Sequence, residues 1–359
     1  MAVITVKAAD LTENYRRLKE ELGDVLLLAF LKGDGYGLGA DWLAKILWEA
    51  GQRIFCTARA DEALRLRMTL PEAEIWLCSV YDDPGLLAKL AAARIVPTVD
   101  SVSGLERLKA ASDGQLMRCH VAVDTGMGRD GLREDQLDGF ISACKLCTGL
   151  QIVSVFTHYA NCYGGHRGEK ATMAQNARFW AALERFKAAG VETGLHHACN
   201  SAAALLYPGL RMDAVRIGSG LLGRCVGAQK AGLIRVGELC APVVAVHELG
   251  KGDTLGYGSV WKARRPQRIA LVEAGHCDGL FLNRTQDGFR LSDRFSAAKH
   301  ALFARRLTAT VNGKRFRVAG RVGMTHLALS DPRGKLQVGD VAAFDFNPVL
   351  AGAREVLHA

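Results

Sequence analysis

The feature that most constrains the fold is an alternation that runs through the first 230 or so residues of this 359-residue chain. Short apolar runs of strand character alternate with longer stretches in which apolar residues recur at helical spacing. A helical stretch, Ala8–Leu22, precedes the first run. Eight strand-like units predict a (β/α)8, TIM-like barrel of the α/β class. The runs are Val25–Leu31, Ile54–Ala58, Glu74–Ser79, Arg94–Val99, Leu116–Asp124, Leu150–Thr157, Leu195–Cys199 and Asp213–Ile217.

The pattern changes after residue 236, where helical periodicity nearly disappears. The chain continues in β-branched segments, such as LCAPVVAVHEL and KRFRVAGRV, that are separated by Gly, Asp or Asn turns. Such segments predict a smaller, all-β domain. We therefore expect an N-terminal barrel domain over residues 1–236 and a C-terminal β domain over residues 237–359.

The net charge of +9 is unevenly distributed between these two parts. Residues 1–236 carry 28 basic and 26 acidic side chains, whereas residues 237–359 carry 18 and 11. A basic half could attract nucleic acid or small anions. Its charges are interleaved with strand-like apolar residues, and no zinc finger, aromatic RNA-binding signature or basic helix accompanies them. We prefer to interpret them as a solvated β surface and expect no nucleic-acid partner.

Composition indicates an ordinary globular protein, with 49% hydrophobic and 23% charged residues. No run approaches the ~20 apolar residues of a membrane helix, and Lys7 and Asp10 interrupt any signal peptide. Ten cysteines are scattered mostly through apolar runs, which is typical of reduced, cytoplasmic cysteine. The pair Cys144 and Cys147 could belong to a zinc or redox site, but no second pair follows. We interpret the pair as two small residues one helical turn apart, and we expect no metal site.

Polar and glycine-rich segments follow five of the predicted strands, at the end of a barrel where active sites lie. The last two offer glycine N–H groups and a hydroxyl, which suit a phosphate group. Lys32 follows the first strand. Each segment alone has an ordinary explanation as a turn or a solvated charge. Together they indicate pyridoxal phosphate held as a Schiff base on Lys32. The segments are Leu31–Gly37, Val123–Arg129, Thr157–Asn161, His197–Ser201 and Arg216–Gly220.

These segments also carry a family resemblance. The motifs LKGDGYGLG, VDTGMGRDGL, FTHYAN, HHACNSAA, VRIGSGLLG, LGYGSVW and GRVGM occur in this order between about residue 20 and residue 345. The chain resembles the alanine racemase family of fold-type III pyridoxal phosphate enzymes. The resemblance implies a barrel followed by a β domain. It also implies a head-to-tail homodimer in which the β domain of one chain completes the partner's site.

The resemblance assigns roles to individual residues. Lys32 and Tyr257 would be the two catalytic bases, with Tyr257 delivered by the other subunit. Arg129 and the backbone N–H of Met324 would bind the substrate carboxylate. His197 would support Arg216, which would face the pyridine nitrogen. The cofactor-binding set would be Lys32, Tyr36, Arg129, His158, Asn200, Ser201, Arg216, Gly218 and Ser219.

The reaction explains these residue types. Racemisation removes the α-proton from one face and returns a proton on the other, so two bases must flank the α-carbon. An arginine opposite the pyridine nitrogen keeps its own proton, so the nitrogen stays unprotonated. Less negative charge is then drawn from the α-carbon into the ring, which favours return of the proton to the α-carbon. A carboxylate at that position would favour transamination over racemisation.

Several family positions differ in this chain. Ala122 stands where many members carry a carbamylated lysine beside the substrate arginine. Thr325, His276 and Tyr163 replace family residues at the carboxylate end and the entrance, and the short tail lacks the family's phosphate-binding tyrosine. The altered surroundings leave alanine and serine both open as substrates, because Thr325 or His276 could bind a serine hydroxyl.

Three alternatives stay open at this point. One is a racemase of another amino acid. A second is a related decarboxylase of basic amino acids, which Arg216 and Tyr257 argue against, because such enzymes use glutamate and cysteine there. The third is a non-catalytic pyridoxal phosphate carrier built on a lone barrel, which the β domain argues against.

Overall fold

The computed structural model describes residues 1–112, 114–163, 165–281, 307–350 and 355–359. The chain divides into two compact units, Ala8–Val236 and a second unit made of Met1–Lys7 with Gly237–Ala359. The first seven residues therefore cluster with the β unit, not with the barrel, where we placed them. They form β1 (Val3–Val6), which pairs antiparallel with β10 (Glu238–Leu249) and parallel with β18 (Val356–His358). Strand pairing, not chain proximity, decides their membership.

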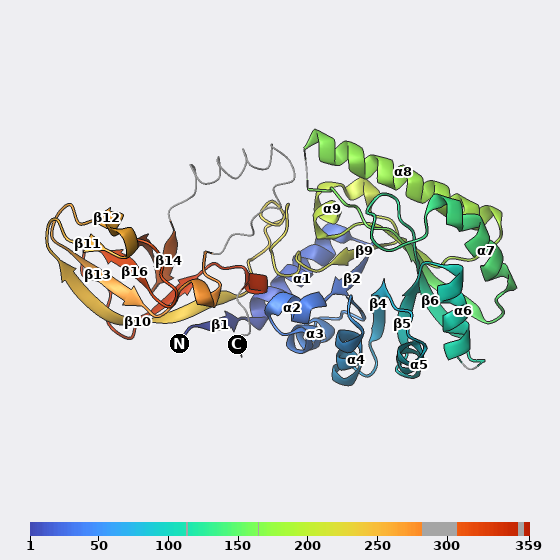
Figure 1. Ribbon diagram of the computed structural model, residues 1–359, viewed down its shortest axis with the longest axis horizontal. Coiled ribbons are helices and arrows are strands. Elements are labelled where there is room, and N and C mark those ends of the chain that lie inside the picture. The colour runs from blue at the N-terminus through green and yellow to red at the C-terminus, as the bar shows by residue number, and fades with distance from the viewer. Residues whose placement is uncertain (113, 164, 282–306, 351–354) are drawn as a thin grey trace. The chain divides into compact units, whose positions relative to one another are not determined.

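The larger unit is a closed barrel of eight parallel strands, which confirms the predicted fold (Figure 1). The barrel closes where β2 pairs with β9, with Leu26 opposite Ala214. The strands are β2 (Leu26–Phe30), β3 (Ile54–Thr57), β4 (Glu74–Val80), β5 (Ile95–Val99), β6 (Met117–Ala122), β7 (Leu150–Phe156), β8 (Leu195–His197) and β9 (Ala214–Ile217).

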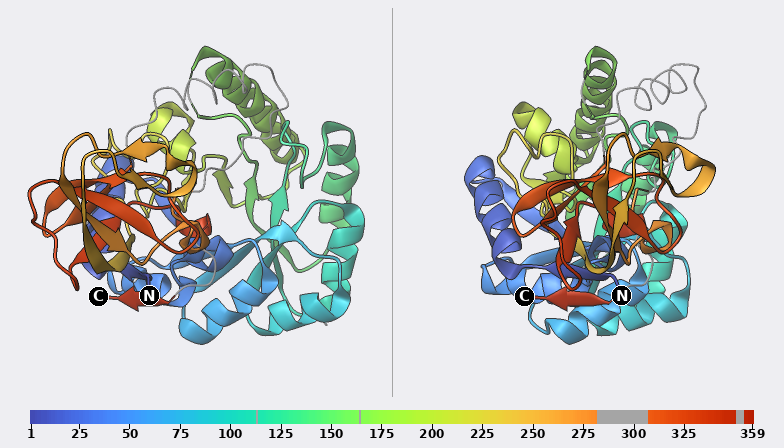
Figure 2. Two further views of the ribbon diagram at one scale, coloured as in Figure 1. Left: turned by 60° about the vertical axis from the view of Figure 1, so that its left-hand side comes forward. Right: turned by 90° about the vertical axis from the view of Figure 1, so that its left-hand side faces the viewer.

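Helices form an outer ring around these strands, which the left view of Figure 2 shows. They bury apolar stripes against the barrel, as the helical spacing of their apolar residues predicts. The helices are α1 (Ala8–Leu22), α3 (Ala40–Glu49), α4 (Ala60–Thr69), α5 (Pro84–Ala92), α6 (Val102–Ala111), α7 (Leu137–Leu146), α8 (His166–Ala188) and α9 (Ser201–Leu206). The short segment α2 (Lys32–Gly37) is not part of this ring, because it is a left-handed turn that follows β2.

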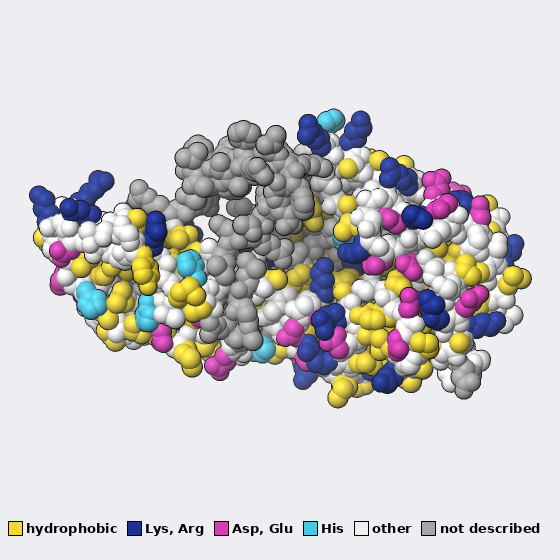
Figure 3. Space-filling view, in the orientation of Figure 1, with side chains coloured by type: hydrophobic (Ala, Val, Ile, Leu, Met, Phe, Trp, Pro, Cys, Tyr) yellow, Lys and Arg dark blue, Asp and Glu magenta, His cyan; other side chains and the backbone are white. Residues whose placement is uncertain are grey.

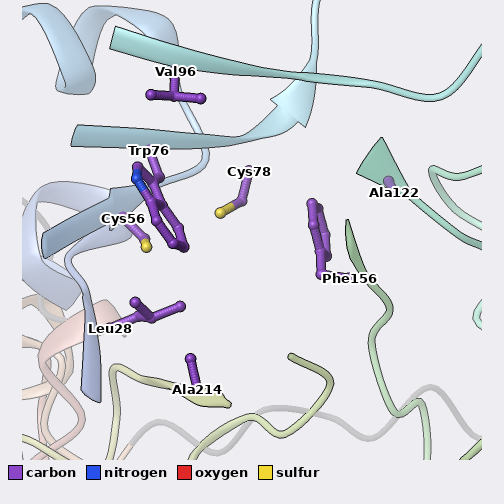
Figure 4. Packing of buried hydrophobic residues seen from close by; sticks show 8 residues of the cluster. All are labelled: Leu28, Cys56, Trp76, Cys78, Val96, Ala122, Phe156 and Ala214. Atoms are coloured by element: carbon purple, nitrogen blue, oxygen red, sulfur yellow. The ribbon is translucent and has the colours of Figure 1, made fainter. Parts of the chain in front are cut away.

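The barrel interior is a packed core and not a pore. Side chains from seven of its strands meet there, with Cys78 lying between the rings of Trp76 and Phe156 in the view of Figure 4. Each member of the cluster is at most 7% exposed. The cluster comprises Leu28, Cys56, Trp76, Cys78, Val96, Ala122, Phe156 and Ala214.

All ten cysteines are free thiols. Cys144 is buried within α7, and Cys147 is the residue that caps its C-terminal end. Among the described residues, no group of three or more His, Cys, Asp or Glu side chains could hold a metal ion.

The second unit is built on an eight-stranded sheet in the order β13-β16-β15-β14-β17-β10-β1-β18, with β13 also pairing with β10. A small hairpin, β11–β12, stands apart from this sheet. The segments LCAPVVAVHEL and KRFRVAGRV correspond to β10 and β15. The sequence did not predict β16, whose Leu-Ala-Leu-Ser-Asp run is nearly all buried and rich in residues that also favour helices. The strands not yet bounded are β11 (Thr254–Leu255), β12 (Trp261–Lys262), β13 (Gln267–Val272), β14 (Thr308–Val311), β15 (Lys314–Ala319), β16 (Leu327–Asp331) and β17 (Val341–Phe344).

The surface of the barrel unit is charged, and its charges are of both signs (Figure 3). Basic and acidic side chains are interspersed on the face of the barrel unit that Figure 3 shows. Within the part of the chain that the structure describes, no helix is long and apolar enough to cross a membrane.

Candidate active site

The C-terminal ends of five barrel strands carry the predicted site residues. Lys32 and Tyr36 follow β2, Arg129 follows β6, and His158 follows β7. Because parallel strands place these ends at one rim of the barrel, the side chains share one face. Asn200 and Ser201 follow β8, while Gly218 and Ser219 follow β9.

The segment that carries Lys32 and Tyr36 has an unusual backbone. Residues 33–36 all have positive φ, including the non-glycine residues Asp34 (50°) and Tyr36 (60°). A left-handed helical conformation costs roughly 1–2 kcal/mol per non-glycine residue. Asp34 stabilises the turn, because its N–H donates to Glu62 Oε1 (3.0 Å) and its carboxylate accepts from Ala40 N (3.1 Å) and pairs with Arg65. The turn fixes the directions in which Lys32 and Tyr36 leave the strand.

Lys32 lies in an environment that disfavours its charge. Burial is the largest cause lowering its pKa from the ordinary 10.5, and the cations Arg129 and Arg216 lower it further. Its Nζ lies 5.6 Å from the centroid of the Phe30 ring. A lysine with a lowered pKa is neutral over a wider pH range, and a neutral amine is the form that attacks a carbonyl carbon.

Ser201 organises a cradle at the end of β9. Its Oγ accepts hydrogen bonds from the backbone N–H groups of Gly218 (3.0 Å) and Gly220 (3.1 Å). Both lone pairs of the hydroxyl are then used, which leaves its proton free to donate to an anion. The side chain of Asn200 accepts from Ala202 N and Ala203 N, both at 3.1 Å, and so fixes the backbone that carries Ser201.

Tyr36 closes the other side of this cradle. Its hydroxyl hydrogen-bonds the backbone of Ser219, and burial raises its pKa to about 12, so it remains a neutral phenol. A Cβ atom at position 218 would overlap the Tyr36 hydroxyl and would approach the carbonyl oxygen of Phe30 to 2.8 Å. Only glycine fits at position 218 without displacing Tyr36.

Arg216 is the most constrained cation of the site, at 4% exposure. Its Nη1 donates to His197 Nδ1, and its Nη2 donates to the carbonyl oxygens of Thr157 (2.6 Å) and Ala198 (3.1 Å). These partners are all neutral, and no carboxylate lies within ion-pair distance of Arg216 among the described residues. Burial lowers the pKa of Arg216 from its ordinary value, but arginine still keeps its proton.

His158 lies beside Arg216, with its Nδ1 3.3 Å from Arg216 Nη2 and its Nε2 3.5 Å from Asn200 Nδ2. Burial, together with Arg216, Arg129 and Lys32, lowers the pKa of His158 to about 3. The ring is therefore neutral at physiological pH. It offers a flat, uncharged surface next to the cations.

Arg129 extends from a rigid loop after β6. Asp124 Oδ1 accepts from the N–H groups of Gly126 (2.9 Å), Met127 (2.9 Å) and Gly128 (3.0 Å), which fixes the backbone just before Arg129. The Arg129 side chain is 52% exposed and pairs with Asp130 at 3.2 Å. Ala122 is buried in the barrel core, so it contributes no charged group to this loop.

Tyr257 and Met324 belong to the β unit and not to the barrel. Tyr257 opens the short 3-10 turn Tyr257–Ser259 after β11 and is 75% exposed. Met324 is 64% exposed, and its carbonyl oxygen accepts a hydrogen bond from Cys277 N at 3.0 Å. Both predicted residues are thus displayed on the surface of their own unit.

Sequence reasoning missed two buried residues, Ser154 on β7 and His120 on β6. They continue the hydrogen-bond chain that starts at Arg216 and His197. Both lie in the middle of strands, where apolar periodicity carries no signal for a polar contact. The only available hint was a hydroxyl and an imidazole inside otherwise apolar runs.

A barrel rim with one lysine of lowered pKa, a hydroxyl-and-amide cradle and a buried arginine defines an enzyme of the pyridoxal phosphate class. Family models agree. The alanine racemase N-terminal domain matches residues 6–225, and the alanine racemase C-terminal domain matches residues 236–345. The chain belongs to the alanine racemase family. It is accordingly an isomerase, an amino-acid racemase, of a family whose enzymes use pyridoxal phosphate, which confirms these predictions.

Individual relatives support this assignment. The alanine racemase of Acidiphilium cryptum is 33% identical over 296 residues, covering 82% of this chain and 75% of the relative. The structure of an alanine racemase from Streptomyces coelicolor superposes with a TM-score of 0.82 at 23% identity, covering 100% and 98% of the two chains. A Bartonella henselae alanine racemase, whose structure holds covalently bound pyridoxal phosphate, gives 0.78 at 23% identity, covering 100% and 99%.

The residues present fit this cofactor. The free proton of Ser201 is a donor for a phosphate, next to the Tyr36 hydroxyl that glycine at position 218 accommodates, while Lys32 supplies an amine of lowered pKa. Arg216, held by neutral partners, supplies a permanent donor for a pyridine nitrogen. None of these contacts with the cofactor requires an acidic side chain.

Proposed function

We propose that the chain interconverts L- and D-alanine, with Lys32 and Tyr257 acting as bases on opposite faces of the α-carbon. The observation that carries the proposal is the buried Arg216, whose partners are a neutral imidazole and backbone carbonyl oxygens. Pyridoxal phosphate, when bound, withdraws electrons from the α-carbon and so acidifies its proton. Arg216 limits that withdrawal, because it never gives a proton to the ring nitrogen.

The remaining residues bind and orient the reactants. Ser201, Tyr36 and the backbone of Gly218 and Ser219 hold the phosphate, and His158 and Asn200 flank the ring. Arg129 and the N–H of Met324 hold the substrate carboxylate. Fixing both ends leaves the α-carbon between the two bases, where one removes a proton and the other returns one.

We further propose that the active form is a cytoplasmic homodimer, in which Tyr257 and Met324 act in the partner's site. Tyr257 is exposed on the β unit, and it is the only tyrosine after residue 207. A side chain displayed in this way is suited to a site outside its own unit. A C2 homodimer would form two such shared sites.

Alanine is the proposed substrate because both domain models of the alanine racemase family match the chain, and two side chains suited to a serine hydroxyl lie in the β unit. Thr325 Oγ1 lies 3.0 Å from His326 Nδ1, and His276 Nδ1 lies 3.1 Å from the carbonyl oxygen of Leu280. Neither contact excludes serine, because the Thr325 hydroxyl can still accept a hydrogen bond and His276 keeps its Nε2. Small pockets discriminate such substrates by only about 10–200-fold, so a slower reaction with serine is compatible with the proposal.

The proposal is tested by incubating the cofactor-loaded protein with single enantiomers of alanine or serine and following inversion by chiral chromatography. Alanine should invert faster than serine. Lys32→Ala should lose both inversion and the visible absorbance of the lysine–cofactor linkage, whereas the exposed Lys45→Ala on α3 should keep them. Absence of inversion by the loaded wild-type protein would contradict the proposed activity.

A further inference from the structure

A buried chain of hydrogen bonds leads from Arg216 into the barrel. Arg216 contacts His197 Nδ1, and His197 Nε2 lies 3.0 Å from Ser154 Oγ. Ser154 Oγ in turn lies 2.8 Å from His120 Nδ1. The four side chains come from β9, β8, β7 and β6, and none is more than 4% exposed. Water is therefore not available to replace any of these partners.

The direction of each hydrogen bond follows from Arg216, which can only donate. Burial lowers the pKa of His120 to about 3 and that of His197 well below its ordinary value, so both rings are neutral with one N–H each. His197 Nδ1 must accept from Arg216, which places its proton on Nε2. That proton is donated to Ser154. The serine hydroxyl then donates its own proton to His120 Nδ1.

Ring packing fixes the position of His197. Its ring is parallel to Phe156, with centroids 5.2 Å apart at an angle of 2°, and is stacked near Trp76 at 5.8 Å and 23°. Figure 4 shows Trp76 and Phe156 facing each other across the barrel interior. Packing restricts the plane of the imidazole, but it does not decide which nitrogen carries the proton. Arg216 decides that by donating to Nδ1, and Ser154 stabilises the outcome because its Oγ accepts the proton on Nε2.

His120 ends the chain at an energetic cost. Its ring lies 4.4 Å from Trp76, and its buried Nε2 has no hydrogen-bond partner among the described residues. An unpaired buried polar atom destabilises the folded state, so an apolar residue would fill this space better. The useful atom of His120 is therefore Nδ1, which accepts from Ser154.

We propose that Ser154 and His120 are positioning residues that stabilise the Nε2-protonated tautomer of His197 and thereby hold the protonated Arg216 guanidinium against the cofactor's pyridine nitrogen. This inference rests on the proposed function, which gives Arg216 that role. With Arg216 fixed, the proton returns to the α-carbon and alanine is released as its enantiomer. If Arg216 were displaced, a protonated ring nitrogen would no longer be disfavoured. The proton taken from the α-carbon would then go more often to the cofactor's former aldehyde carbon, and water would hydrolyse the imine, leaving the amino group on the cofactor and releasing pyruvate.

Paired variants separate this role from a merely structural one. Ser154→Ala and His120→Leu break the chain, whereas His120→Asn keeps an acceptor oxygen near the position of Nδ1 and should rescue it. Thr98→Val is the matched control. It removes another buried hydroxyl hydrogen bond of the barrel, from Thr98 Oγ1 to the carbonyl oxygen of Leu77 (2.7 Å), that does not reach Arg216. If Ser154→Ala does not fold, the two His120 variants decide the question.

The first readout is the tautomer of His197, measured by 15N NMR on histidine-labelled holoenzyme, with its signals assigned from a His197→Gln spectrum. Wild type should show the proton on Nε2, and Ser154→Ala should shift that nitrogen's signal and give a mixed tautomer at His120. A proton on Nδ1 of His197 in wild type, or an unchanged spectrum in Ser154→Ala, would overturn the proposal. This readout does not depend on whether alanine is the substrate.

The second readout is the ratio of pyruvate formed to alanine racemised. We expect it to rise at least about tenfold in Ser154→Ala and His120→Leu, to stay near wild type in His120→Asn, and to be unchanged in Thr98→Val. An equal rise in Thr98→Val, or none in the first two variants, would show that the chain does not act through Arg216. Failure of wild type to racemise alanine would instead refute the proposed function, and the tautomer readout would still apply.

Discussion

The hydroxyl of Tyr36 occupies the space that a Cβ atom on residue 218 would need. This close approach joins the turn after β2 to the loop after β9, the two strands at which the barrel closes. The phosphate cradle thus depends on a glycine that accommodates Tyr36 and on a tyrosine that is held by the backbone of Ser219.

Gly218→Ala should displace Tyr36 and open the cradle. Overpacking of this kind costs about 1–3 kcal/mol, and a loss of 1.4 kcal/mol in binding is about tenfold in affinity. We expect cofactor affinity, measured by equilibrium dialysis, to fall by roughly tenfold or more. Gly139→Ala is the control, because Gly139 lies within α7 and a Cβ there meets no atom within 4 Å. Equal affinities for the two variants would argue against the cradle.

The pH dependence of cofactor capture should report the lowered pKa of Lys32. Only the neutral amine reacts with an aldehyde, so the capture rate should rise with pH and level off below the ordinary lysine value of 10.5. Removing a neighbouring cation favours the charged amine, so Arg129→Gln should move the midpoint to higher pH.

Stopped-flow absorbance after mixing apoprotein with pyridoxal phosphate measures this profile. Arg133→Gln is a suitable control, because Arg133 lies four residues from Arg129 but is not among the main causes of the lowered pKa of Lys32. A midpoint at or above 10.5 in wild type would be inconsistent with a lowered pKa of Lys32. A midpoint that Arg129→Gln leaves unchanged would be inconsistent with a lowering of that pKa by Arg129.

Sharing of sites between two chains predicts complementation. Lys32→Ala and Tyr257→Phe should each be nearly inactive as homodimers. Mixing them under conditions that exchange subunits creates hybrids in which one site has both Lys32 and Tyr257. With random exchange, half the dimers are hybrids, so activity should recover to about a quarter of wild type. Mixing Lys32→Ala with the double variant should recover none, and no recovery in the first mixture would exclude a shared site.

Much of the barrel could be predicted from the sequence, because each buried parallel strand is a short apolar run and the helices repeat their apolar residues at helical spacing. The predicted run Leu150–Thr157 differs from β7 (Leu150–Phe156) by a single residue, and Asp213–Ile217 differs from β9 (Ala214–Ile217) in the same way. The site residues at the strand ends could be found for a related reason. The barrel geometry brings those ends to one rim, whatever the lengths of the intervening helices.

Other features could not be predicted, because they depend on pairing between distant segments. Residues 3–6 look like any short strand, and only their pairing with β10 and β18 assigns them to the β unit. The contact of Ser154 with His120 and His197 depends on the register of three strands, which one sequence does not reveal. The left-handed turn at residues 33–36 was visible only as a cluster of glycines.

The most direct test of the two-base account is α-proton exchange in deuterated water, measured by mass spectrometry from each pure enantiomer. Wild type should incorporate deuterium from both L- and D-alanine. We assign Tyr257 to the face that carries the α-proton of L-alanine and Lys32 to the opposite face. We therefore predict that Tyr257→Phe slows exchange from L-alanine far more than exchange from D-alanine, because Lys32 can still remove and return the proton on its own face. Unchanged exchange in this variant, or equal losses from both enantiomers, would contradict the account.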